Sequence, residues 1–124
     1  MSRKHAIHDA EPSVITSHGA DFFGEDRHPL KSVKALAPYA ENSVSVFERS
    51  TVARLLQLLE APVAQTFSAT EAAELSEQLL KVSRDRHLKS GLAAIARHLA
   101  DAAGRAAAGG EPWTWSVEGS TAAA

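Results

Sequence analysis

The chain has 124 residues, of which 44% are hydrophobic and 23% charged, with a net charge of −2 and no cysteine. This composition fits one globular domain, argues against global disorder and general nucleic-acid affinity, and excludes disulfides, thiolate metal sites and cysteine nucleophiles. No apolar segment approaches the ~20 residues that a membrane-spanning helix needs, and no apolar run follows the basic N-terminus, so we expect a soluble cytoplasmic protein.

The start of the chain is predicted to be a tail, a strand and a polar loop. Residues 1–12 show no periodicity. Residues 13–17 are rich in β-branched side chains and precede a His-Gly pair, which is typical of a strand that runs into a turn. The polar composition of residues 20–28 predicts a loop that ends at Pro29.

The middle of the chain is predicted to contain two helices and a second strand. Apolar residues recur at helical spacing from Leu30 onward, and Pro38 ends or kinks that helix. Polar and apolar residues alternate over 43–47, which is typical of a strand. Ser50 or Thr51 can then cap a second helix.

The C-terminal half is predicted to form an αα-hairpin. Ser68 and Glu71 match a capping box, in which each side chain accepts a hydrogen bond from the other residue's backbone N–H. On one straight helix, the apolar stripes before and after residues 83–86 would point about 220° apart. We therefore predict a break there, with Ser83 or Asp85 as the cap of the second helix.

The last element is predicted to be a strand with two tryptophans. Residues 113–117 alternate, so Trp113 and Trp115 share one face. We expect this strand to pair with residues 13–17 or 43–47 and thereby to join the two ends of the chain. The alternative to a buried core strand is an exposed aromatic patch that binds a partner.

The predicted elements define an α+β fold. A small sheet of about three short strands packs against about four helices, with the αα-hairpin at the C-terminal end. A single domain is expected over 13–118, with flexible tails at 1–12 and 119–124.

Three side chains in the first predicted loop are candidate metal ligands. They are His18, Asp21 and His28, and two imidazoles with a carboxylate can bind a divalent metal such as zinc. Their spacing matches no known signature, so a solvated polar loop is the commoner explanation. We predict no other cofactor and no catalytic residue, since the neighbours Ser17 and His18 would point to opposite faces of a strand.

Basic residues are concentrated in the predicted hairpin. Between Leu79 and Arg105 there are six Lys and Arg residues but only two Asp. We expect Arg86, Lys89 and Arg97 to project away from the apolar stripe of the last helix, where they can contact phosphates or an acidic protein. A solvated charged face is the commoner alternative.

Two short segments, Ser17–Gly24 (SHGADFFG) and Glu111–Trp115 (EPWTW), carry a resemblance to a known family. The sequence resembles a small uncharacterised domain family of actinobacteria or their phages. The resemblance covers about residues 13–118, and it implies no activity, ligand or catalytic residue.

The sequence favours a non-enzymatic interaction or regulatory domain that binds a protein partner through the basic helix face or the aromatic strand. One alternative is a small metal-assisted enzyme centred on His18, Asp21 and His28. A second alternative is a nucleic-acid-binding regulator, which the net charge disfavours. The sequence leaves self-association open.

Overall fold

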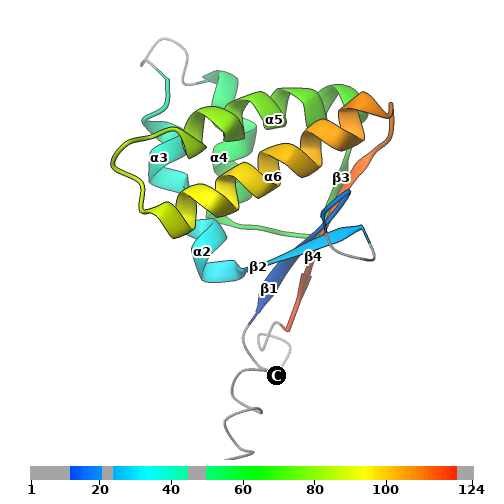
Figure 1. Ribbon diagram of the computed structural model, residues 1–124, viewed down its shortest axis with the longest axis horizontal. Coiled ribbons are helices and arrows are strands. Elements are labelled where there is room, and N and C mark those ends of the chain that lie inside the picture. Colours follow the sequence, from blue (N-terminus) through cyan, green and yellow to red (C-terminus); the bar gives the residue numbers. More distant parts are fainter. Residues whose placement is uncertain (1–11, 21–23, 45–49, 120–124) are drawn as a thin grey trace, which may run out of the picture.

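The protein has an α+β fold, as the sequence predicts. The computed structural model describes residues 12–20, 24–44 and 50–119, and Figure 1 labels its helices and strands. In chain order these are β1 (Ser13–Ser17), β2 (Glu25–Pro29), α2 (Leu30–Lys34), α3 (Ala37–Glu41), α4 (Ala53–Glu60), β3 (Gln65–Phe67), α5 (Ala69–Ser83), α6 (Ser90–Ala108) and β4 (Trp113–Glu118). No helix in these ranges is long and apolar enough to cross a membrane.

One antiparallel sheet brings the two ends of the described chain together. Its strand order is β2-β1-β4-β3, so the C-terminal strand lies between β1 and β3. Ser13 pairs with Glu118, and Thr16 pairs with Trp115. The predicted pairing of the tryptophan strand with residues 13–17 is therefore confirmed.

Two strands of the sheet differ from the sequence-based expectation. The sequence predicts a loop over residues 20–28, but residues from Glu25 to Pro29 form β2 against β1. The segment is charged and lacks apolar alternation, so its strand conformation depends on the hairpin with β1. β3 has three residues, too few for a period of two to be visible. Of the predicted strand 43–47, residues 45–47 lie outside the described ranges, and Ser43 and Val44 are not in a strand.

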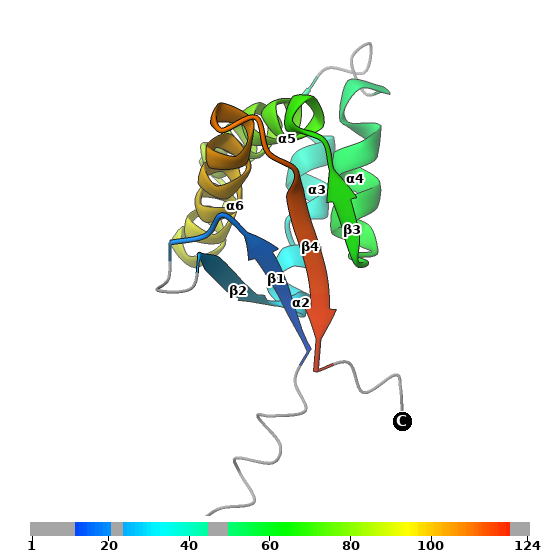
Figure 2. The ribbon, with the colours of Figure 1, turned by 90° about the vertical axis from the view of Figure 1, so that its right-hand side faces the viewer.

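The helices lie to one side of the sheet (Figures 1 and 2). The buried core contains residues of the strands and of the helices that cover them. Trp113, Trp115, Phe67 and Val14 are at most 1% exposed. The indoles of Trp113 and Trp115 pack edge to face, with their ring centres 5.6 Å apart. The ring centres of Phe67 and Trp113 are 6.0 Å apart. These aromatic contacts join β3 and β4 beneath the helices.

The two longest helices, α5 and α6, form the predicted hairpin. Ser68 and Glu71 form the predicted capping box at the start of α5. The Ser76 hydroxyl donates a hydrogen bond of 2.7 Å to the Ala100 carbonyl oxygen. A Cβ at Gly104 would lie 3.2 Å from the same hydroxyl oxygen, so the small residue permits close packing of the two helices.

The connection between α5 and α6 is longer than predicted. α5 ends at Ser83 and α6 begins at Ser90, and Lys89 precedes α6 without a side-chain capping bond. The prediction that Ser83 or Asp85 caps the second helix is wrong. The Asp85 carboxylate instead accepts a hydrogen bond from the His87 backbone N–H within the turn.

The helix predicted from Leu30 onward is two short helices in the structure, α2 and α3. Pro38 lies in the first turn of α3, where its missing N–H costs no helical hydrogen bond. α2 has already ended at Lys34, so the predicted single helix is divided. At α4, neither Ser50 nor Thr51 provides the expected cap, because Val52 occupies the N-cap position.

Candidate functional site

His18 lies just beyond β1, where the backbone adopts a left-handed conformation. Its φ is 60°, a value that His tolerates better than most residues other than glycine. The imidazole therefore reaches the preceding side chain, and Nδ1 of His18 lies 3.0 Å from the Ser17 Oγ. The expectation that these neighbours point apart is wrong, because the strand ends at Ser17 and His18 is not part of it.

The other ring nitrogen of His18 contacts a carboxylate from the far end of the chain. The Nε2 atom lies 2.8 Å from Oε1 of Glu111, between α6 and β4. When Nε2–H donates to this carboxylate, Nδ1 is left to accept the Ser17 hydroxyl proton. The three groups then stand in the order hydroxyl, imidazole, carboxylate, which is also the order of a serine-hydrolase triad.

Further hydrogen bonds around Ser17 and His18 connect three parts of the fold. The Ser17 Oγ accepts the Thr114 backbone N–H at 2.9 Å, and the Ser17 carbonyl accepts the Trp113 indole N–H at 3.0 Å. The Arg105 Nε donates to the His18 carbonyl at 2.7 Å. The network therefore attaches the end of β1 to β4 and to the last turn of α6.

The backbone next to His18 does not offer the donors that acyl transfer requires. A serine hydrolase needs N–H groups directed at the developing oxyanion. The Gly19 N–H already donates to the Gly24 carbonyl, and the Ala20 N–H donates to the Asp26 carboxylate. The geometry therefore supports a structural role for the Ser17, His18 and Glu111 network.

The structure does not bring the predicted metal ligands together. His28 pairs with Val14 on β1, whereas His18 lies beyond the opposite end of that strand, roughly 13 Å further along it. Asp21 lies outside the described residues. In the part of the chain that the structure describes, no three His, Asp or Glu side chains gather closely enough to bind a metal.

His28 is a buried residue of β2 that faces α6. It is 5% exposed, and its ring stacks on that of His98 with centroids 6.2 Å apart. Within the described ranges its Nε2 has no hydrogen-bond partner. Burial lowers the pKa of His28; the charge of Asp26 opposes this effect, and His98 adds to it.

We expect acid to destabilise the protein through His28. Because the folded-state pKa lies below the unfolded value of about 6.5, the unfolded state takes up the proton first as the pH falls. The free energy of unfolding should therefore decline below about pH 6.5, until the lower folded-state pKa is reached. Denaturant titrations between about pH 8 and pH 5 should show a shallower decline for His28→Leu than for the wild type.

The exposed histidine His87 provides the control for this measurement. The variant His87→Gln should retain the wild-type dependence of stability on pH. Equal declines in His28→Leu and the wild type would contradict the assignment to His28.

The three basic residues expected on one helix face occupy two different places. Arg86 and Lys89 are exposed in the turn between α5 and α6. Arg97 lies on α6, where its Nε contacts the Asp101 carboxylate at 3.3 Å. Since this exposed i,i+4 pair partly neutralises Arg97, the positive charge available to a partner lies mainly in the turn.

This turn and the end of α5 form a surface that we name the basic end. Its four exposed basic side chains are Lys81, Arg84, Arg86 and Lys89. None of them forms an ion pair with another described residue. The start of α6 has no side-chain cap, so its free N–H groups add to the positive potential.

Both tryptophans belong to the core. Trp113 is 0% and Trp115 is 1% exposed, and they share the helix-facing side of β4. Neither indole is available to a partner at the surface of this fold, so the structure favours the core-strand interpretation of residues 113–117.

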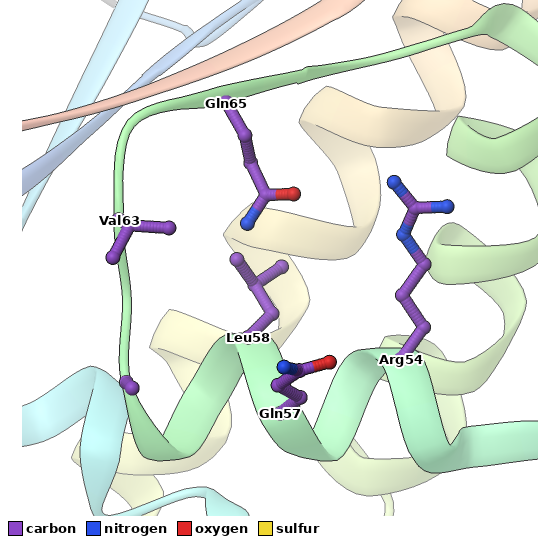
Figure 3. A pocket seen from close by; sticks show the side chains of 6 residues that line it. Arg54, Gln57, Leu58, Val63 and Gln65 are labelled. Atoms are coloured by element: carbon purple, nitrogen blue, oxygen red, sulfur yellow. The ribbon is translucent and has the colours of Figure 1, made fainter.

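A concave surface lies between α4 and β3, and we name it the α4–β3 groove. Its volume is about 540 Å³, within the range of roughly 300–1,000 Å³ that is usual for ligand sites. The lining residues are Arg54, Gln57, Leu58, Ala61, Val63 and Gln65. Figure 3 shows Gln65 and Leu58 reaching into the space from opposite sides, with Arg54 toward one end and Val63 toward the other.

These features define a small α+β domain with a basic end and a separate polar and apolar groove. The chain belongs to the family described as a domain of unknown function, DUF7739, which matches residues 19–116. The resemblance to an uncharacterised domain family is thereby confirmed. No curated protein and no solved structure matches the chain.

Sequence reasoning missed both the network at His18 and the α4–β3 groove. The His18-Gly19 pair is typical of a turn. It could have indicated that His18 lies outside the strand, so that the alternation of strand side chains does not apply to it. Glu111 is 93 positions from His18, so no local pattern connects them. The groove residues come from a helix, a loop and an edge strand that was itself not predicted.

Proposed function

We propose that this chain is a non-enzymatic interaction domain that acts in the cytoplasm. Its basic end contacts an acidic surface of a protein partner. The observation that carries this proposal is the group of four exposed basic side chains without ion-pair partners among the described residues. Arginine favours such a contact because its planar guanidinium can bind a carboxylate through two parallel hydrogen bonds.

The charge distribution favours an acidic protein over nucleic acid. The chain as a whole carries a net charge of −2, and its basic end is confined to one helical turn and a short loop. A few phosphate contacts give only weak and strongly salt-dependent binding. An acidic protein surface can complement Arg84 and Arg86 in shape as well as in charge.

We expect charge reversal at the basic end to weaken binding to an acidic peptide. The double variant Arg84→Glu/Arg86→Glu should weaken binding of a fluorescent deca-glutamate peptide by about tenfold at low salt, because two attractive contacts become repulsive. Binding can be measured by fluorescence anisotropy with the full chain.

The matched control is Arg27→Glu/Arg97→Glu, which changes the net charge equally at two exposed arginines that already have acidic partners. It should alter the affinity by less than about threefold. An equal loss in both doubles would show that only net charge matters. Tight, sequence-selective binding of duplex DNA at physiological salt would instead support a nucleic-acid-binding regulator.

A further inference from the structure

The α4–β3 groove lies beside a free edge of the sheet. β3 is the last strand in the order β2-β1-β4-β3, and among the described strands it pairs only with β4. The backbone groups on the outer edge of such a strand are ready to pair with another extended segment. Figure 3 shows the groove between this strand and α4.

Arg54 is held in a fixed position at one end of the groove. Its Nη1 donates to the Glu71 Oε2 at 2.5 Å, and its guanidinium carbon lies 5.0 Å from the centre of the Phe67 ring. Glu71 is fixed in turn, because its other carboxylate oxygen accepts the Ser68 backbone N–H. This hydrogen bond and the Arg54 charge lower the pKa of Glu71, so the carboxylate remains charged and keeps the guanidinium in place.

The arginine retains donors for a ligand. Within the described ranges, only Nη1 of Arg54 makes a hydrogen bond. The Nε and Nη2 atoms are left to form the parallel pair of bonds that a second carboxylate accepts. The arrangement therefore offers a cation that Glu71 and Phe67 already orient before a ligand binds.

The rest of the groove combines amides with an apolar surface. The side-chain amides of Gln57 and Gln65 make no hydrogen bond to another described residue. Val63 is 53% exposed, more than any other large hydrophobic side chain in the described part of the chain. Together with Leu58 it forms an apolar area at a distance from Arg54 along the groove.

We propose that the α4–β3 groove binds an extended peptide segment of a partner protein as an added strand on β3, with an acidic side chain of the peptide on Arg54 and an apolar side chain against Val63. Strand addition supplies affinity through main-chain hydrogen bonds, and alternate side chains supply specificity. Every second residue of the peptide faces the groove, so the acidic and apolar residues are expected two or four positions apart.

This site is separate from the basic end. Glu71, which holds Arg54, and Arg84 in the basic end lie 13 residues apart at opposite ends of α5, about 20 Å along the helix. The two surfaces can therefore be inactivated independently. The groove proposal goes beyond the interaction proposed for the basic end and does not depend on it.

Selection from a random heptapeptide library displayed on phage tests the proposal with the full chain as target. We expect the enriched peptides to carry an acidic residue two or four positions from Val, Ile or Leu. Synthetic copies should bind Arg54→Gln about tenfold more weakly than the wild type. They should bind Arg27→Gln with unchanged affinity, since Arg27 is a similarly exposed, ion-paired arginine that does not line the groove.

A second variant keeps the test decisive if Arg54→Gln does not fold. Gln57→Glu retains Arg54 and its partners but adds a negative charge to the groove. Because this charge repels the acidic residue of the peptide, the variant should also bind the peptide more weakly. Hydrogen exchange of residues 65–67 should slow when the peptide binds, because an added strand protects their amides.

Three results would overturn the proposal. The first is the absence of any enriched peptide. The second is a set of peptides that is insensitive to Arg54→Gln and lost in Arg84→Glu/Arg86→Glu, which would locate binding at the basic end and leave that proposal standing. The third is a selected peptide whose alternate amides can all be N-methylated without loss of affinity, since strand addition needs those N–H groups.

Discussion

Replacement of Trp113 by alanine should lower the free energy of unfolding by about 3–5 kcal/mol, a large share of the roughly 5–15 kcal/mol of a typical domain. Trp113 is fully buried, contacts Phe67 and Trp115, and donates its indole N–H to the Ser17 carbonyl. Alanine would remove this packing and leave the carbonyl without its donor. Chemical denaturation followed by circular dichroism measures the loss.

A chain that ends before Trp113 should not fold at all. β4 lies between β1 and β3, so its removal separates the β1–β2 hairpin from β3 and opens the core. A chain that ends after Gly119 retains every described strand pair and should melt like the full protein. Cooperative melting of the shorter chain near the full-length temperature would contradict this account of the sheet.

Replacement of Gly19 by alanine should also be strongly destabilising. A Cβ at this position would lie 2.2 Å from the Glu25 carbonyl carbon and 2.3 Å from the Asp26 nitrogen. Both atoms belong to the backbone of the β1–β2 hairpin, so no side-chain rotation can relieve the overlap. Overpacking costs about 1–3 kcal/mol and sometimes more, and we expect a value at or above the upper end of that range.

Gly91 in the first turn of α6 is the matched control. A Cβ there would meet nothing within 4 Å. Gly91→Ala should therefore be neutral or stabilise the protein by up to about 1 kcal/mol, because alanine favours a helix more than glycine does. Melting temperatures of the two variants give the comparison. Equal melting temperatures for Gly19→Ala and the wild type would show that Gly19 is not packed as closely against the backbone of Glu25 and Asp26 as the structure indicates.

Those parts of the fold with a strong local pattern could be predicted from the sequence. The capping box at Ser68 and Glu71 defined the start of α5, and alternation around Trp113 defined β4. Residues 25–29 carry charged side chains without alternation, and their strand conformation comes from pairing with β1. The start of α6 could not be predicted from capping residues because Lys89 supplies no side-chain cap.

The candidate sites were less accessible to sequence reasoning than the core. The excess of basic residues in the hairpin was visible in the sequence. That Arg86 and Lys89 lie in the turn, whereas Arg97 lies on α6 and contacts Asp101, could be seen only in the structure. The Arg54 guanidinium is oriented by Glu71 and Phe67 from two other elements. These contacts form between separate elements when the chain folds. No pattern in the sequence predicts them, and β3 itself is too short to be recognised.

Chemical-shift mapping tests most directly whether the basic end binds an acidic partner. The full ¹⁵N-labelled chain is titrated with deca-glutamate at about 0.05 M and about 0.15 M salt, since screening separates general attraction from close contact. We expect the largest shifts at residues 81–90, smaller but still confined to these residues at the higher salt, and strongly reduced in Arg84→Glu/Arg86→Glu. Shifts that are spread evenly over the surface, or that disappear at the higher salt, would contradict a specific acidic partner at the basic end.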